Sequence, residues 1–79
     1  MQDLLPEIIR YHRKRSGLTQ IELAELADVG KNLVYEVESG KKSVRLSNVM
    51  KILQALNIEL DFNSPLRENF IKDYKNAKS

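Results

Sequence analysis

Residues 18–40 read LTQIELAELADVGKNLVYEVESG, and this stretch predicts two short helices joined by a tight turn. Thr19 and Glu22 have the T-x-x-E spacing of a capping box, so the first of these helices is expected to run from about Gln20 to Ala27. A turn over 28–30 follows, because Asp and Gly tolerate backbone conformations outside the helix.

The second helix of this pair is expected to run from about Lys31 to Ser39, with Gly40 just past its end. At about 100° per residue, Val34, Val37 and Glu38 fall on one side of it. The opposite side is polar and aromatic and comprises Lys31, Asn32, Tyr35, Glu36 and Ser39. Such a helix packs through its valines and presents polar groups to a partner.

Residues 18–58 resemble the helix-turn-helix of the Cro/C1-repressor (XRE-type) family. The matching residues are Leu18-Thr19-Gln20, Glu22-Leu23-Ala24, Ala27, Val29, Val34, Val37-Glu38, Gly40-Lys41-Lys42 and Leu56-Asn57-Ile58. Three positions depart from the family pattern: Asp28 where Gly is frequent, Gly30 in place of a Ser or Thr cap, and Val44 in place of Pro. The resemblance implies a DNA-binding transcriptional repressor whose second motif helix enters the major groove.

The candidates for contacts to base edges are the residues Lys31, Asn32, Leu33, Tyr35 and Glu36. Lys donates to guanine, Asn pairs bidentately with adenine, and Glu accepts from cytosine. The candidates for phosphate contacts lie at helix ends and in the basic loop after Gly40, and they are Thr19, Gln20, Ser39, Lys41, Lys42, Ser43 and Arg45. The expected partner is double-stranded DNA with a palindromic operator, whose half-sites lie about 34 Å or a multiple of that apart.

Glu38 lies on the packing side of its helix, where an unpaired carboxylate is costly. In the resembled family, an arginine of the first helix at the position of Arg13 pairs with a glutamate at the position of Glu38. The resemblance therefore implies a structural ion pair between Arg13 and Glu38.

The 79 residues suffice for one small domain, with a net charge of +2 and no cysteine. Between positions 10 and 45 lie eight Lys or Arg and five Asp or Glu, an excess that favours DNA contact, although so small a difference also arises by chance. The chain has no nucleophile–base set, phosphate loop or cluster of metal ligands, so we expect no enzyme activity, metal or cofactor. The single histidine, His12, is expected at the edge of the core. Without a signal peptide or an apolar run that could cross a membrane, the simplest location is the cytoplasm.

Two further helices are expected to complete a mainly α, small helical bundle over residues 1–57. The first begins between Asp3, its expected cap, and Pro6, and it ends at Gly17. Its inward stripe comprises Leu5, Ile8, Ile9 and His12. The other runs from about Leu46 to Leu56 and is ended by Asn57. Its inward stripe comprises Leu46, Val49, Met50, Leu53 and Leu56.

Residues 58–62 read IELDF, and this alternation of apolar and acidic residues predicts a strand within a dimerisation segment, 58–63. A lone strand lacks hydrogen-bond partners, and the nearest solution is the same strand of a second copy across a two-fold axis. The arrangement resembles HipB-type antitoxins, and it would make Ile58, Leu60 and Phe62 the residues of a dimer strand. The alternative is an extended tail packed on its own domain.

Residues 64–79 form a C-terminal tail in which Ser64-Pro65 can begin a weak amphipathic helix. Leu66, Phe70 and Tyr74 share one side of it, so the tail either docks on the dimer or on another protein, or it frays. The resemblance to HipB-type antitoxins implies that the homodimer restrains a HipA-like kinase toxin and represses the operon encoding both. A plain repressor of phage or metabolic type and a protein-only interaction module are the alternatives.

Overall fold

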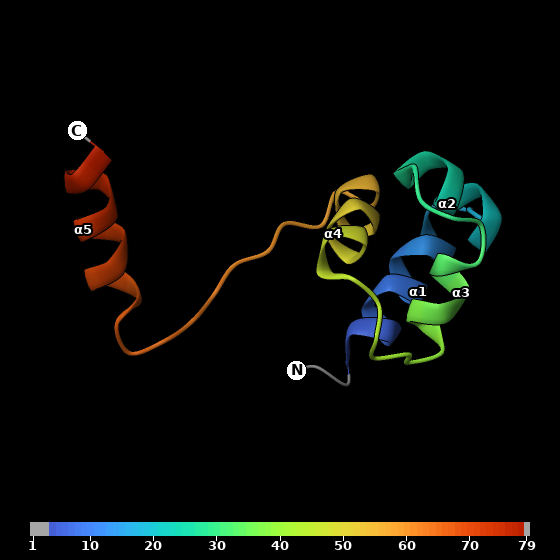
Figure 1. The fold of residues 1–79 in the computed structure, drawn as a ribbon, viewed down its shortest axis with the longest axis horizontal. Helices are drawn as coiled ribbons and strands as arrows, with labels where there is room; N and C mark the ends of the chain where they lie inside the picture. The colour runs from blue at the N-terminus through green and yellow to red at the C-terminus, as the bar shows by residue number, and fades with distance from the viewer. Residues whose placement is uncertain (1–3, 79) are drawn as a thin grey trace.

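Five helices make up the computed structural model, which describes residues 4–78. They are α1 (Leu5–Arg15), α2 (Gln20–Ala27), α3 (Leu33–Glu38), α4 (Leu46–Ala55) and α5 (Arg67–Lys78). The first four form a compact bundle, while α5 stands apart at the end of an extended linker (Figure 1). The Cα radius of gyration is 15.1 Å, larger than the roughly 12 Å of a compact domain of this length, because of that outlying helix.

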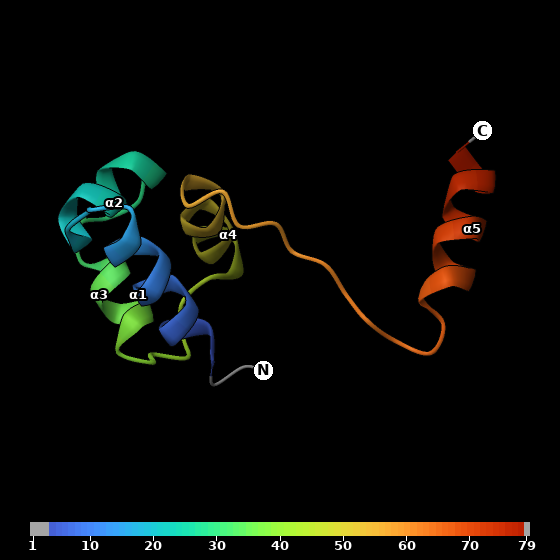
Figure 2. The same ribbon diagram turned by 180° about the vertical axis from the view of Figure 1, so that it is seen from behind.

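The core lies where the first four helices meet. Each contributes one side chain that is fully buried: Ile9, Leu23, Val34 and Ile52. Seen from behind, α3 lies against α1 and α2 (Figure 2). Burying an aliphatic side chain of this size contributes about 1.5–3 kcal/mol, so these four side chains stabilise the packing of the four helices.

The start of α2 and the turn after it follow the sequence prediction. Thr19 Oγ1 accepts from the Glu22 N–H at 3.0 Å, and the Glu22 carboxylate accepts from the Thr19 N–H at 2.9 Å, so the capping box is complete. At the other end Asp28 has a φ of 58°, the left-handed conformation that ends a helix. The predicted bounds of α2 are confirmed.

The second motif helix is shorter than predicted. Lys31 and Asn32 form a turn instead of the first helical residues, and the Leu33 N–H donates to the Gly30 carbonyl at 3.0 Å. Asn32 is the N-cap of α3 and makes no side-chain capping bond. The helix therefore begins at Leu33 and not at Lys31. Ser39 lies in the turn that follows.

Two predicted core residues prove to be exposed. Leu46 begins α4 with 73% of its surface accessible, because it lines an open cavity beside Leu5 and Val49 instead of packing into the core. His12 lies on the outside of α1, where its Nδ1 is 2.7 Å from the carbonyl of Ile8. Ile52, which the predicted stripe of α4 omitted, is fully buried instead. The predicted cap Asp3 lies outside the described residues.

The predicted strand at 58–62 is absent from the part of the chain that the structure describes. Asn57, with a φ of 59°, ends the turn after α4, and residues 58–64 then run without regular secondary structure. The physical reason is that no second strand within the described residues offers hydrogen bonds to this one. Ile58 alone of the alternating apolar residues packs against the core, whereas Leu60 and Phe62 are exposed.

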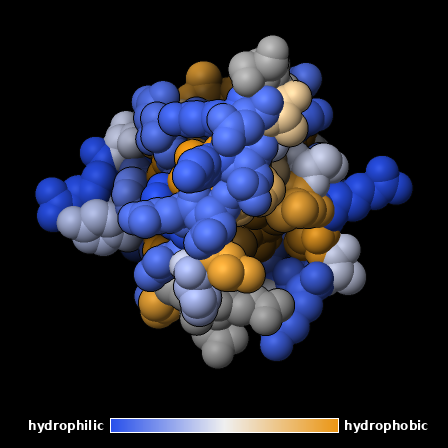
Figure 3. All heavy atoms as spheres, turned by 90° about the vertical axis from the view of Figure 1, so that its left-hand side faces the viewer, coloured by the Kyte–Doolittle hydropathy of each residue, from blue (hydrophilic) through white to orange (hydrophobic). Residues whose placement is uncertain are grey.

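The C-terminal tail forms a helix, which begins at Arg67 and not at Pro65 as predicted. Its packing partners come from the linker: the rings of Phe62 and Phe70 meet edge-on at 5.7 Å, and the Arg67 guanidinium lies 5.6 Å from the centre of the Phe62 ring. Figure 3 views the molecule from the α5 end and shows a mainly hydrophilic foreground with hydrophobic patches beside it. No helix among residues 4–78 has the length and hydropathy needed to cross a membrane.

Candidate nucleic-acid interface

The outer side of residues 31–39, here called the recognition face, is open on the surface of the domain. Lys31, Asn32 and Ser39 are exposed, Tyr35 is 61% accessible, and Glu36 is half-buried. On the inner side Val34 and Val37 are buried against the core. The helix therefore has one packed side and one free side, as its sequence predicted.

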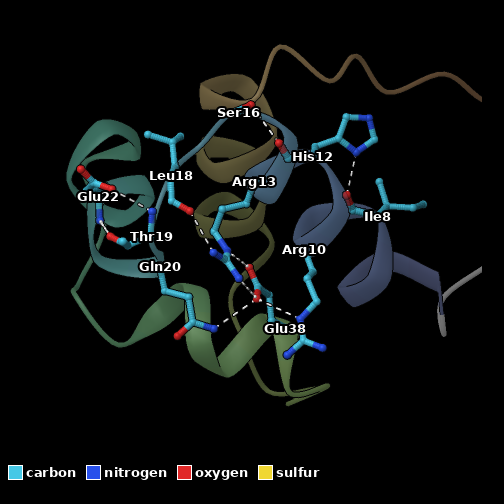
Figure 4. Close-up of polar contacts among 10 residues, drawn as sticks. All are labelled: Ile8, Arg10, His12, Arg13, Ser16, Leu18, Thr19, Gln20, Glu22 and Glu38. Atoms are coloured by element: carbon cyan, nitrogen blue, oxygen red, sulfur yellow. Dashed lines mark hydrogen bonds and ion pairs between the residues drawn. The ribbon is translucent and has the colours of Figure 1, made fainter.

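The predicted ion pair between Arg13 and Glu38 is present and joins α1 to α3 (Figure 4). Arg13 Nε donates to Glu38 Oε2 at 2.6 Å, and Nη2 donates to Oε1 at 3.0 Å. Arg13 Nη1 donates to the Leu18 carbonyl at 2.9 Å. The side chains are only 10% and 1% accessible, so the pair is shielded from water and its geometry is bidentate.

Two more side chains converge on the same carboxylate. Gln20 Nε2 donates to Glu38 Oε1 at 3.1 Å, and Arg10 Nε lies 3.6 Å from that oxygen. Figure 4 shows Gln20 and Arg10 approaching Glu38 from opposite sides. Arg10 was absent from the sequence prediction, although it precedes Arg13 by three residues and so lies one helical turn away on α1.

This environment keeps the Glu38 carboxylate charged. Burial by itself raises the pKa of Glu38, but hydrogen bonds from Arg13 and Gln20 and the charges of Arg13 and Arg10 outweigh it, and the pKa falls below its ordinary value. The hydrogen bond to Glu38 in turn raises the pKa of Arg13, against the effect of burial.

Glu36, a candidate for base contact, and Lys41, a candidate for phosphate contact, are paired with each other. Lys41 Nζ lies 2.5 Å from Glu36 Oε2, and the Lys41 N–H donates to the Glu36 carbonyl at 3.0 Å. The pair ties the loop after α3 to the end of that helix. In this arrangement the negative charge of Glu36 is offset at the recognition face.

The other predicted residues divide into free and engaged side chains. Lys42, Ser43 and Arg45 are exposed in the loop before α4. Ser39 Oγ donates to the Glu36 carbonyl at 2.8 Å, and the Thr19 hydroxyl is an acceptor in the capping box. Leu33 is half-buried and packs against the core, which makes it the least available of the base-contact candidates.

No group of three or more His, Cys, Asp or Glu side chains among residues 4–78 is arranged to hold a metal ion. The polar groups brought together at α1, α2 and α3 are instead two guanidinium groups and one amide around the buried Glu38 carboxylate. Such an arrangement positions the side chains at the edge of α3.

Four packed helices with an anchored α3 define a helix-turn-helix protein. A helix-turn-helix family model matches residues 9–63, so the chain belongs to this family. It is 34% identical over 58 residues to an uncharacterized HTH-type transcriptional regulator, y4mF, of Sinorhizobium fredii, which covers 73% of this chain and 76% of that protein. It is 38% identical over 71 residues to an uncharacterized HTH-type transcriptional regulator of Methanothermobacter thermautotrophicus, which covers 90% of this chain and 96% of that protein.

Proposed function

We propose that this protein is a sequence-specific DNA-binding transcriptional regulator that acts as a homodimer. The observation that carries the proposal is the recognition face: α3 is fixed to α1 and α2 by buried valines and an ion pair, and its outer side chains are uncovered. Membership of the helix-turn-helix family and the names of the two regulators support it. α3 would lie in the major groove of each half-site.

The base contacts fall to the start and the middle of the recognition face. Lys31 and Asn32 precede the first turn of α3, and Tyr35 follows one turn later. In our proposal Asn32 pairs with adenine and Lys31 donates to guanine. Glu36 accepts from cytosine only after Lys41 has turned away from it, since the two are paired in the free protein.

The phosphate contacts surround this face. Lys41, Lys42 and Arg45 follow α3, and their exposed cationic side chains would position the DNA backbone without reading sequence. Gln20 begins α2, where the positive end of the helix dipole adds to its attraction for a phosphate. Thr19, Ser39 and Ser43 complete the set as neutral hydrogen-bonding groups.

The dimer is proposed from the linker. Leu60 is 58% accessible and Phe62 is 46% accessible, so both offer apolar surface that one chain leaves uncovered. The extended backbone of residues 58–62 can pair with the same segment of a second copy across a two-fold axis, which would also present two α3 helices to a palindromic operator.

A kinase toxin of HipA-like type is the proposed protein partner. Leu66 is 68% accessible, Phe70 is 54% and Tyr74 is 50%, and the helix that carries them stands clear of the DNA-binding domain. An amphipathic helix of this kind suits docking on another protein. A kinase-like reading frame beside the gene would favour this antitoxin role over that of a repressor without a toxin partner.

The test is selection of bound DNA from a random pool at physiological salt. We expect a palindromic consensus whose affinity falls steeply as salt is raised. Replacing Lys31 and Asn32 together by Ala should abolish consensus binding with the fold intact, while Lys72→Ala on α5 should leave it unchanged. A pool that yields no enriched sequence, or undiminished binding by the double variant, would refute the proposal.

A further inference from the structure

Glu38 receives more positive partners than its charge requires. Arg13 alone balances the carboxylate, and all three of its guanidinium nitrogens are engaged, two with Glu38 and one with the Leu18 carbonyl. Arg10 is therefore a surplus cation beside a charge that is already neutralised. The cluster of Arg10, Arg13 and Glu38 carries a net positive charge at neutral pH.

Arg10 has unused donors. Its side chain is 55% accessible, and within residues 4–78 its charge partner is Glu38, whose Oε1 lies 3.6 Å from Arg10 Nε, too far for a hydrogen bond. Within residues 4–78 its terminal guanidinium nitrogens donate no hydrogen bond. A guanidinium offers five N–H groups in a planar fork whose geometry matches two oxygens of one phosphate.

Gln20 contributes from the other side. One N–H of its amide donates to Glu38 Oε1, and the amide has a second N–H. Gln20 Nε2 and Arg10 Nε lie 3.1 and 3.6 Å from the same oxygen, Glu38 Oε1, so α2 and α1 place the two side chains on the two sides of one carboxylate at the edge of α3 (Figure 4).

We infer that Arg10 and Gln20 together form a clamp for one backbone phosphate of DNA, with the buried Glu38 carboxylate as its anchor. Before binding, Glu38 holds Gln20 by a hydrogen bond and attracts Arg10 by its charge, which lowers the conformational entropy that the clamp loses on binding. The clamp sets the register of α3 in the groove without reading sequence. The inference rests on the proposed function, since the phosphate belongs to the DNA that α3 reads.

The test uses the full chain with Arg10→Gln, and measures Kd from about 50 to about 200 mM salt on the selected consensus duplex and on a scrambled duplex. We expect the slope of log Kd against log salt to fall by about 1, with the same factor of affinity lost on both duplexes. Lys51→Gln, which removes one exposed charge from α4, is the matched control and should leave the slope unchanged. Circular dichroism and thermal unfolding of Arg10→Gln should match the wild type.

The outcomes separate the clamp from the proposed function. If the wild type binds DNA with a steep slope and Arg10→Gln has the same slope, the clamp is wrong and the function stands. If the wild type shows no salt-dependent binding, the function itself fails. Titration with inorganic phosphate distinguishes a site for free anions: binding at low millimolar concentration that Arg10→Gln removes, with the DNA slope unaltered, would overturn the assignment to DNA.

Discussion

Arg13 Nε lies 2.6 Å from Glu38 Oε2, and this contact joins α1 to α3 across 25 positions of the chain. The carboxylate is 1% accessible and accepts from two elements, α1 and α2. The orientation of α3 thus depends on a charge pair as well as on valine packing. The same pair also organises the donors at the edge of the recognition face.

Arg13→Met should destabilise the domain by about 3–5 kcal/mol, because it leaves the Glu38 carboxylate buried without its main partner. Urea unfolding followed by circular dichroism measures the change. Lys51→Met, at an exposed position of α4, should alter stability by less than about 0.5 kcal/mol. Replacing Arg13 and Glu38 together by Met should cost less than Arg13→Met alone, and a strictly additive loss would show that the two side chains are not coupled.

Acid should weaken the fold through Glu38. Its pKa is depressed in the folded protein, so the stability it contributes is complete above the ordinary glutamate value of about 4.3 and is lost as pH falls through the lower folded value. The difference in unfolding free energy between the wild type and Glu38→Gln should therefore narrow below about pH 4.3. Asp61→Asn is the control: the pKa of Asp61 is also lowered, by the Phe62 N–H and then by Arg67, but this carboxyl is fully exposed, so solvent screens its interactions and the substitution should change stability little at any pH. A difference that stays constant down to pH 2 would contradict the assignment.

Removing the capping box should weaken α2. Thr19→Ala deprives the Glu22 N–H of its acceptor and should cost about 0.5–2 kcal/mol. For a domain of this size, a loss of 1 kcal/mol lowers Tm by roughly 4–8 °C, which calorimetry resolves. Thr19→Ser keeps the hydroxyl and should unfold close to the wild-type temperature, so equal losses in both variants would point to the methyl group instead.

Deleting residues 64–79 should leave the unfolding free energy of the domain nearly unchanged. Among the side chains that the structure describes, none from residues 67–77 belongs to the core, and the last residue packed against it is Ile58. Urea unfolding at several protein concentrations provides the measurement. A stability loss that grows as the protein concentration is raised would instead show that the tail stabilises an oligomer. A loss that is independent of concentration would show packing of α5 on its own domain.

The local signals in the sequence were sufficient for most helix boundaries. The capping box predicted α2 to the residue, and the spacing of Val34 and Val37 predicted which side of α3 is buried. They failed where the local sequence leaves more than one outcome. Asn32 is as acceptable in a turn as in a helix, and Leu46 fits an inward stripe although it lines an open cavity and stays exposed.

The sequence by itself determined that this chain has two short helices around a tight turn, because capping, glycine placement and apolar period act over a few neighbouring residues. Only the tertiary structure decided that Arg10, Gln20 and Glu38 meet at one point, and that Glu36 pairs with Lys41. Distances between residues of different helices depend on how those helices pack, and no periodicity within one helix specifies that packing. The position of α5 also depends on tertiary contacts, since Phe70 of this helix meets Phe62 of the linker and does not pack in the core.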